Sequence, residues 1–311
     1  MITENSSNAF KSRDANSYDS VASEYDLFTE RLSGPLAEWV ISLARIKPSE
    51  RVLDIGSGNG IVALQAARQV GPHGKVLGVD LSEGMLATAQ GKAAAAGLSD
   101  RAEFRKMDAE ALELASESFD VVVSLFALLH FPNPLVALKE MLRVLRPGGR
   151  LCVAVGSGPP RLSVNGLIDG FRHLRYILLK RRGKLLTAPA FLDHLVEMRF
   201  PNPDKNEVTS LAAHASKIPL AVPSLVRKAG FTEVGTTWQR RQRVIETPEE
   251  FWDLQRAYSS MARKRLSAAP PEQIEAFRKV FLERCRTVQS KRGQLVYPFA
   301  ALYVVARRPR S

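Results

Sequence analysis

The residues best suited to bind a ligand form the segment VLDIGSGNG, from Val52 to Gly60. An apolar run typical of a strand leads into a loop with glycine at every second position, and a helical pattern follows. Glycine permits positive φ and lets a ligand lie directly against the backbone. Asp80 ends the next apolar run, 20 residues after Gly60, where a doubly wound nucleoside site has the carboxylate that binds ribose hydroxyls. The spacing therefore predicts a nucleoside site rather than a plain tight turn.

The charge of this loop indicates which nucleoside it binds. Ile61 follows Gly60 directly, so the third glycine comes one position too early for the dinucleotide fingerprint. Asp54 precedes the glycines, and its carboxylate would repel a pyrophosphate docked at the helix N-terminus. The same carboxylate suits a ligand with an ammonium group near the loop. S-adenosylmethionine carries that ammonium and no phosphate, so we favour it over NAD or ATP.

His130 is the best candidate for acid–base chemistry. Methyl transfer from a sulfonium is an in-line displacement, for which the protein chiefly holds the reacting atoms collinear in a dry site. A general base helps when the acceptor must lose a proton. His130 follows an apolar run that predicts a strand, at the end where open α/β sheets bind ligands, so it either acts as this base or only shapes the pocket. No group of His, Cys and carboxylates has metal-binding spacing, so we expect no metal.

The elements that must position these residues begin at Arg51, where short apolar runs start to alternate with helical stretches. Strands are expected at residues 51–56, 75–82, 102–109, 119–128 and 150–156. This alternation is typical of α/β proteins in which helices cover both faces of a parallel sheet. Before Arg51, residues 1–17 are polar and expected to be mobile, and two short helices separated by Gly34 and Pro35 follow.

Five sequence motifs occur in the order found in one enzyme family. They are VLDIGSGNG, VLGVDLSEGML, KMDAEAL, FDVVVSLFALLHF and LRPGGRL. With them the chain resembles the class I S-adenosylmethionine-dependent methyltransferases, and among these the small-molecule enzymes similar to the ubiquinone/menaquinone C-methylases. The resemblance implies a doubly wound, Rossmann-like sheet of seven strands, the last one antiparallel, with helical cap insertions. It also implies S-adenosylmethionine as the methyl donor and S-adenosylhomocysteine as the product.

The resemblance extends to individual residues of these motifs. It implies contacts to the methionine part of the cofactor from Asp54, Gly56, Ser57, Gly58 and Gly60, to the ribose from Asp80, to the adenine from Leu81, Met85, Asp108 and Ala109, and from beneath the cofactor from Ser124. It locates His130 at the mouth of the active site. The segment YDSVASEYD resembles the N-terminal lid of such enzymes, in which a tyrosine bonds the carboxylate of the cofactor. Tyr18 and Tyr25 are the candidates for this contact, unless both only pack against the sheet.

The sequence pattern divides the chain into a core and two insertions. We expect N-terminal lid helices over residues 1–33, a cofactor-binding core over 34–158, a core helix and strand over 221–245, and a terminal core strand with its tail over 293–311. The remaining segments, 159–220 and 246–292, are expected as helical insertions that cap the acceptor pocket and determine substrate choice. Thr247 and Glu250 have the spacing of a capping box, which predicts a helix beginning at Pro248.

The positive charge is concentrated in the second half of the chain. The whole sequence has 44 Lys and Arg against 32 Asp and Glu, a net charge of +12. Residues 1–155 contain 16 basic and 19 acidic side chains, whereas residues 156–311 contain 28 basic and 13 acidic ones. In the second half, FRHLRYILLKRRGK at 171–184 has six Lys or Arg and no acid, with apolar residues between them. Such a segment contacts an anionic membrane or an acidic ligand, or is simply a solvated basic face.

Composition and length exclude several protein classes. Hydrophobic residues make up 45% of the 311 and charged residues 24%, which is ordinary for a globular protein. No apolar run reaches the roughly 18 residues that cross a bilayer, and the polar start has no apolar signal region. Two cysteines are too few for a disulfide scaffold. We therefore expect a cytoplasmic protein.

Two classes of activity remain open from the sequence. The first is a methyltransferase for a small apolar or aromatic acceptor, methylated on oxygen or carbon in a capped pocket. The second is an RNA- or protein-directed methyltransferase that docks through the basic second half. Against nucleic acid, SLFALL stands where enzymes that methylate base amines have N-P-P-Y or D-P-P-Y, and no RNA- or DNA-binding module is recognisable. A small-molecule acceptor is therefore the favoured partner.

Overall fold

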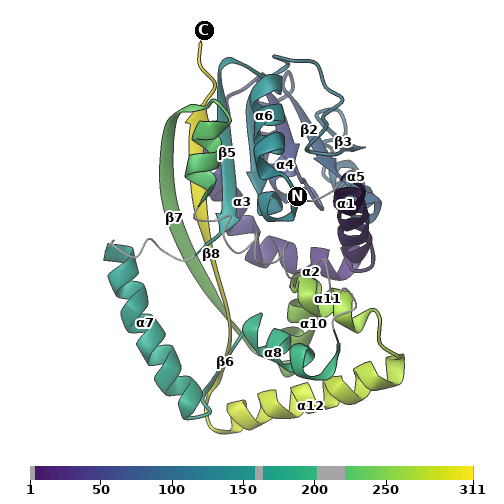
Figure 1. Cartoon of the computed structure of the whole chain (residues 1–311), viewed down its shortest axis with the longest axis vertical. Helices are drawn as coiled ribbons and strands as arrows, with labels where there is room; N and C mark the ends of the chain where they lie inside the picture. The colour runs from purple at the N-terminus through teal and green to yellow at the C-terminus, as the bar shows by residue number, and fades with distance from the viewer. Residues whose placement is uncertain (1–3, 158–163, 202–220, 311) are drawn as a thin grey trace. The chain divides into compact units, whose positions relative to one another are not determined.

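Eight strands form a sheet in the computed structural model, which describes residues 4–157, 164–201 and 221–310 (Figure 1). They are β1 (Arg51–Ile55), β2 (Lys75–Asp80), β3 (Ala102–Lys106), β4 (Phe119–Leu125), β5 (Leu145–Gly156), β6 (Leu185–Thr187), β7 (Thr232–Ile245) and β8 (Gln294–Arg307). Their order is β3-β2-β1-β4-β5-β8-β6, and β7 also pairs with β8. Strands β1 to β5 are parallel, and β8 runs antiparallel to β5. The predicted doubly wound sheet is confirmed, with β6 added to the expected seven strands because it pairs with β8.

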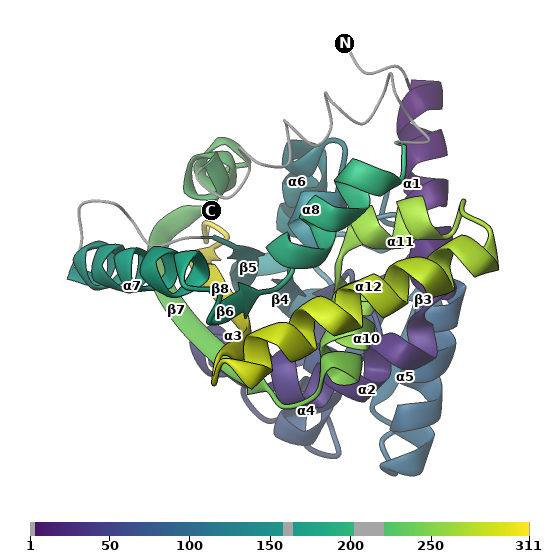
Figure 2. The same ribbon diagram turned by 90° about the horizontal axis from the view of Figure 1, so that it is seen from below.

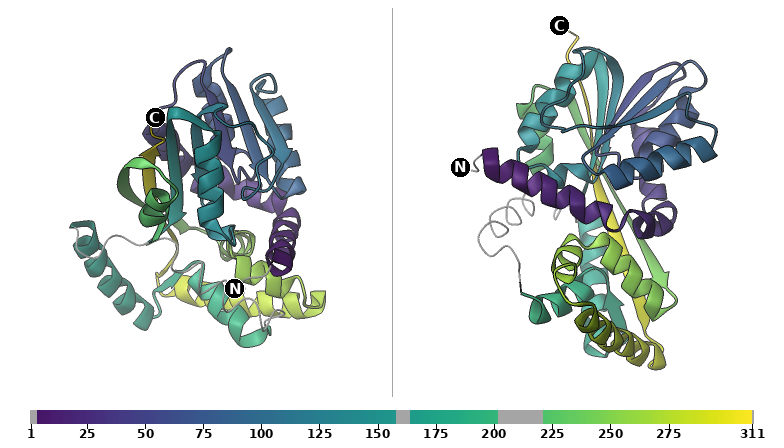
Figure 3. Two further views of the ribbon diagram at one scale, coloured as in Figure 1. Left: turned by 45° about the horizontal axis from the view of Figure 1, so that its top comes forward. Right: turned by 90° about the vertical axis from the view of Figure 1, so that its right-hand side faces the viewer.

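Helices cover both faces of this sheet (Figure 3). The described helices are α1 (Glu4–Asp19), α2 (Ala22–Leu32), α3 (Gly34–Ala44), α4 (Ile61–Val70), α5 (Glu83–Ala95), η1 (Ala127–His130), α6 (Pro134–Val144), α7 (Val164–Arg181), α8 (Ala190–Arg199), α10 (Pro248–Tyr258), α11 (Ser260–Leu266), α12 (Pro271–Ser290) and a stretch at residues 221–228. Helices α3 and α4 pack against each other and the sheet. Helix α6 and residues 221–228 cover the opposite face.

The core beneath α6 is built from alternate residues of the central strands. Leu53 of β1 and Val122 of β4 are fully buried there, together with Leu138 and Met141 of α6 and Val226. Their neighbours along each strand point to the other face, towards α3 and α4, because side chains alternate along a strand. Burial on both faces explains why these strands are continuous apolar runs in the sequence.

Contacts within the chain define two units. Unit 1 is Met1–Ser157, Ser210–Gln239 and Ala301–Ser311, and unit 2 is Gly158–Thr209 and Arg240–Ala300. Residues 159–209 of the expected first insertion and the whole of the expected second one are thus grouped in unit 2, together with parts of β7 and β8, whereas unit 1 begins again at residue 210. That this unit caps the acceptor pocket stays a prediction. Residues 159–163 and 202–220 of the expected first insertion lie outside the described residues.

Unit 2 has an aromatic core of its own. The ring of Phe281 on α12 contacts those of Phe251 and Trp252 on α10. The hydroxyl of Thr247 accepts the amide of Glu250 and caps α10, so the predicted start of this helix is confirmed. None of the described helices is long and apolar enough to cross a membrane.

The expectation that residues 1–17 are mobile is wrong, because α1 includes most of them. None of the apolar side chains described in α1 is buried, so apolar periodicity could not predict this helix. Polar contacts hold it instead. Lys11 pairs with Asp108 at 2.8 Å, and the carboxylate of Asp19 accepts the hydroxyl of Ser82 at 2.6 Å.

Replacing Met141 by alanine should lower the free energy of unfolding by about 2–5 kcal/mol, because it empties a fully buried site between α6 and the sheet. Val136→Ala on the same helix is the control. Val136 is 44% exposed, so its replacement should change the stability by less than about 0.5 kcal/mol. Urea unfolding of both variants measures the difference, and equal effects would contradict the packing of α6.

Candidate functional site

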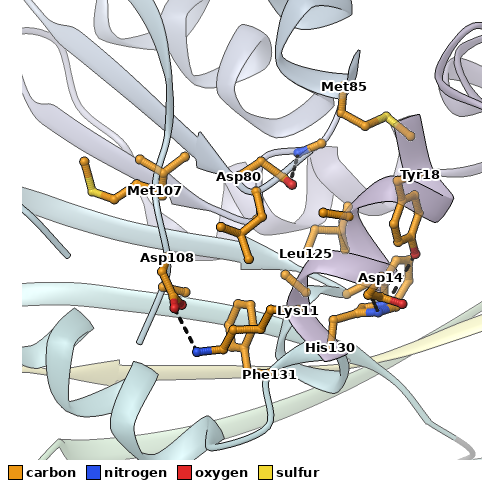
Figure 4. Close-up of a pocket in the computed structure, with 18 of the residues that line it drawn as sticks. Lys11, Asp14, Tyr18, Asp80, Met85, Met107, Asp108, Leu125, His130 and Phe131 are labelled. Atoms are coloured by element: carbon orange, nitrogen blue, oxygen red, sulfur yellow. Dashed lines mark hydrogen bonds and ion pairs between the residues drawn. The ribbon is translucent and has the colours of Figure 1, made fainter. Parts of the chain in front are cut away.

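A pocket opens in unit 1 at the carboxyl ends of β1, β2 and β4, where doubly wound sheets bind ligands (Figure 4). Its volume, with the open mouth and the solvent in front of it included, is about 870 Å³. The lining residues are Lys11, Asp14, Ala15, Tyr18, Tyr25, Gly56, Gly58, Val79, Asp80, Leu81, Met85, Met107, Asp108, Ala109, Leu125, Phe126, Ala127, His130 and Phe131. Strand ends, α1, α2 and η1 therefore meet at one site.

Ten of the fourteen residues expected at the site line this pocket. They are Tyr18, Tyr25, Gly56, Gly58, Asp80, Leu81, Met85, Asp108, Ala109 and His130. The other four, Asp54, Ser57, Gly60 and Ser124, are buried and do not line it. The hydroxyl of Ser124 donates to the carbonyl of Ile55 at 2.8 Å, so it joins the ends of β4 and β1.

The three glycines of the loop meet different constraints. A Cβ on Gly56 would lie 2.2 Å from that of Ala127, and one on Gly60 would lie 3.0 Å from that of Ala89. These two glycines therefore allow the loop to pack closely against its neighbours. Gly58 has a φ of 52°, and a Cβ there would meet no atom within 4 Å. Because Gly58 also lines the pocket, the space beside it lets a ligand lie against the backbone.

Asp54 and Ser57 have buried polar atoms without hydrogen-bond partners in the described part of the chain. Asp54 is only 1% exposed, and burial raises the pKa of its carboxyl to about 7. The backbone amide of Ala63 opposes the rise of this pKa only in part. Because a buried carboxylate is costly, the arrangement suits a cationic group supplied from outside the chain. The ammonium of S-adenosylmethionine has that charge, and the residues present therefore fit the predicted cofactor.

The side chain of Asp80 forms hydrogen bonds with the glycine loop. Its carboxylate accepts the amide of Gly58 at 2.8 Å and the amide of Ser82 at 3.0 Å. Burial raises the pKa of this carboxyl, while the amide hydrogen bonds oppose the rise. The amide of Gly56 donates to the carbonyl of Val79 at 2.8 Å. The end of β2 thus holds the glycine loop in place.

His130 lies between two side chains of α1 (Figure 4). Its Nδ1 is 2.8 Å from the carboxylate of Asp14, and its Nε2 is 3.3 Å from the hydroxyl of Tyr18. The side chain of Asp14 is only 9% exposed. A carboxylate accepts hydrogen bonds and does not donate them, so Nδ1 carries the hydrogen and Nε2 is the basic nitrogen of the neutral ring.

The turn that delivers His130 begins at Phe126, whose φ is 65°. This left-handed conformation is uncommon for a bulky residue, and it costs about 1–3 kcal/mol that the surroundings must supply. The amide of Phe126 donates to the carbonyl of Ala154 at 2.8 Å, which fixes the turn to β5. Strain of this kind clusters at functional sites.

Lys11 contacts the carboxylate that was expected beside the adenine. Its ammonium lies 2.8 Å from Asp108 and 2.7 Å from Glu110. Burial lowers the pKa of Lys11, but hydrogen bonds to the two carboxylates outweigh it and raise the pKa overall. The ammonium therefore stays charged and holds α1 against the loop that follows β3.

Sequence reasoning missed Lys11, Asp14 and Asn59. The side-chain amide of Asn59 donates to Asp26 at 2.6 Å and to Thr29 at 2.8 Å, which connects the glycine loop to α2. Asn59 stands inside the first motif, so its amide was a signal for a contact with the lid. Lys11 and Asp14 lie in a polar segment without apolar periodicity. Their charge is the only feature in the sequence that distinguishes them as candidates for the site.

The two cysteines do not add a reactive group to the site. Cys152 and Cys285 are buried free thiols. Burial raises the pKa of each thiol to about 12, so neither is a thiolate near neutral pH. Among the residues that the structure describes, no three His, Cys, Asp or Glu side chains are grouped so as to hold a metal ion.

The raised pKa of Asp54 predicts a pH-dependent stability of the ligand-free protein. The unfolded chain loses this proton near pH 4 and the folded chain near pH 7, so the carboxyl increasingly destabilises the fold as the pH rises between these values. Asp54→Asn has no such proton. Its free energy of unfolding should therefore rise relative to wild type by up to about 1.4 kcal/mol per pH unit in this window. Urea unfolding across the window measures this difference, and a constant difference would contradict the assignment.

The proteins that this chain resembles in sequence are methyltransferases. Residues 52–149 match the family described as methyltransferase domain. The chain is 34% identical over 203 residues to the ubiquinone/menaquinone biosynthesis C-methyltransferase UbiE of Azotobacter vinelandii, covering 64% of this chain and 79% of that protein. It is 32% identical to UbiE of Pseudomonas putida strain F1, with 64% and 78% covered.

Two crystal structures share the fold. The [4+2]-cyclase SpnF has a TM-score of 0.50 and 20% identity, with 90% of this chain and 83% of that chain covered. A Bacillus halodurans protein proposed to be a methyltransferase has a TM-score of 0.51 and 20% identity, with 88% and 98% covered. At this identity the two structures show the fold alone.

The motifs, the sheet and the UbiE relatives lead to the same assignment. The buried carboxylate of Asp54, which suits a cationic ligand group, agrees with it. The chain therefore belongs to the class I S-adenosylmethionine-dependent methyltransferases, and it is an enzyme whose cofactor is S-adenosylmethionine.

Proposed function

We propose that this enzyme methylates a small apolar or aromatic acceptor on oxygen or carbon. The UbiE relatives, which are named for C-methylation in ubiquinone and menaquinone biosynthesis, support a small acceptor. Leu125, Phe126 and Phe131 give the pocket an apolar wall, which supports an apolar one. The observation that carries the proposal is His130, held by Asp14 in the same pocket as the glycine loop.

For the cofactor, we propose that its methionine end lies against Gly56 and Gly58, with the carboxylate of Asp54 behind the loop on the side of its ammonium. The remaining contacts would come from Asp80 to the ribose and from Leu81, Met85, Asp108 and Ala109 to the adenine, with Ser57, Gly60 and Ser124 supporting the loop from behind. Between the two tyrosines, Tyr25 is the better candidate for the carboxylate of the cofactor, because the hydroxyl of Tyr18 already lies against His130.

The bound cofactor supplies an electrophilic methyl group, whose bond to sulfur breaks as a bond to the acceptor oxygen or carbon forms. In this proposal Nε2 of His130 takes the proton that the acceptor loses. Asp14 stabilises the imidazolium that results and keeps the hydrogen on Nδ1. In this proposal the acceptor takes the place of the Tyr18 hydroxyl, which lies 3.3 Å from Nε2. Asp14 is a positioning residue, because it touches the histidine and not the acceptor. The apolar wall excludes water from the reacting atoms.

Gly58→Val and Asp80→Ala should each abolish binding of S-adenosylmethionine in calorimetry. The valine side chain would project into the space beside the loop, and the alanine would remove the carboxylate that holds the Gly58 amide. Gly97→Val is the matched control. Gly97 also has a positive φ, 64°, and a Cβ there would likewise meet no atom within 4 Å, yet it does not line the pocket. Unchanged affinity in the first two variants would refute the cofactor site.

His130→Ala should lower kcat by about 100-fold or more on the best acceptor, which is the range for loss of a general base, and change cofactor affinity little. Asp14→Asn should lower kcat by at least about tenfold with an unchanged KM for S-adenosylmethionine. The assay follows formation of S-adenosylhomocysteine with a panel of phenols, hydroquinones and activated methylene compounds. Product NMR then locates the new methyl group.

The contact between Asp14 and His130 can also be tested by a measurement that does not need the acceptor. The ¹⁵N NMR spectrum of neutral His130 should show hydrogen on Nδ1 in the wild type and a shift towards the Nε2–H tautomer in Asp14→Asn. An unchanged tautomer in the variant would reduce Asp14 to a structural role. Full activity of His130→Ala would remove the base from the mechanism.

A further inference from the structure

Unit 2 carries a cluster of exposed apolar side chains on α7. Phe171, Leu174, Ile177 and Leu178 are exposed by 77, 56, 36 and 48%. Nine large hydrophobic residues are exposed in the described part of the chain, and four of them lie in these eight consecutive positions. Single exposed apolar residues are ordinary, whereas a cluster of this kind marks an interaction surface.

The apolar side chains share the face of α7 that points away from β7. Residues 171, 174 and 178 are three and four positions apart, so they lie one above the other on the helix. Tyr176 lies on the other side. Its hydroxyl donates to Gln242 of β7 at 2.6 Å, and the guanidinium of Arg240 is 5.8 Å from the centre of its ring. Within unit 2, α7 also lies apart from α8 (Figure 2).

Exposed cations are frequent on α7 and just after it. They are Arg172, Arg175, Lys180, Arg181, Arg182 and Lys184, and no Asp or Glu occurs between residues 170 and 192. By helical spacing, Arg175, Arg181 and Arg182 border the apolar side chains. Unit 2 as a whole has 22 Lys and Arg against 12 Asp and Glu, so the charge of the unit has the same sign as the charge of the helix.

We propose that α7 lies flat on an anionic lipid surface, with Phe171, Leu174 and Leu178 inserted among the headgroups and the arginines bound to lipid phosphates. An apolar stripe bordered by cations is the pattern of interfacial helices. Long cationic side chains reach the headgroups while their stems lie in the apolar layer, and their charge complements anionic lipid. Nucleic acid would pair with the cations but leave the apolar side chains in water. This surface is additional to methyl transfer and does not depend on the acceptor.

The test is cosedimentation of the full chain with vesicles of phosphatidylglycerol and phosphatidylcholine, and with vesicles of phosphatidylcholine alone. Binding to the anionic vesicles should be at least about tenfold stronger and should weaken as salt is raised. The double variant Leu174→Asp/Leu178→Asp and the triple variant Arg175→Gln/Arg181→Gln/Arg182→Gln should each lose at least about tenfold in vesicle affinity.

Met198→Asp on α8 is the matched control, because Met198 is an apolar residue of the same unit that is 60% exposed. It should bind vesicles like the wild type. Calorimetric binding of S-adenosylmethionine should be equal in all variants, which shows that unit 1 is folded, and an unchanged far-UV circular dichroism spectrum shows that unit 2 keeps its helices. Equal affinity for both vesicle types, no binding by the wild type, or full binding by the Leu double variant would overturn the proposal. Tight retention of total RNA that the Leu double variant keeps and the Arg variant loses would overturn it in favour of a nucleic-acid surface.

Discussion

The register of β1 between β2 and β4 is the constraint on which the site depends. Ile55 pairs with Val79, and Asp54 pairs with Val123, so the three strands end side by side. The glycine loop, the carboxylate of Asp80 and the turn at Phe126 then emerge at the same edge of the sheet. A shift of one residue in β1 would turn its apolar side chains to the wrong face. The burial of the core on both faces therefore also determines the position of the loop.

A different kind of interaction completes the pocket. The sheet is held by apolar packing, whereas α1 is held by Lys11, Asp14 and Asp19 through ion pairs and hydrogen bonds. Exposed ion pairs contribute little to stability, but Lys11 and Asp14 are mostly shielded from solvent, with 12% and 9% of their side chains exposed. One side of the pocket is therefore formed by the strand ends, which are held by the apolar core. The other side is formed by α1, which is held by ion pairs and hydrogen bonds.

The sequence predicted the parts of the site that depend on local pattern. A strand, a glycine loop and a helix occur in succession from Val52 onwards, and Asp80 ends the next strand, so their positions follow from periodicity and spacing. The pair of Asp14 and His130 could not be predicted, because it joins residues 116 positions apart through a helix without a buried apolar side. Strand β6 has three residues, which is too short to give a periodic signal. Unit 2 contains none of the five motifs, so its organisation had only helical periodicity as a guide.

The docking of α1 by charge has a consequence for protein engineering. Asp14 and Tyr18, the side chains that contact His130, belong to a helix that adds almost nothing to the apolar core. The glycine loop and Asp80 are positioned by the sheet instead. Libraries restricted to Asp14 and Tyr18 would therefore vary the surroundings of His130, while the apolar core and the glycine loop are inherited unchanged.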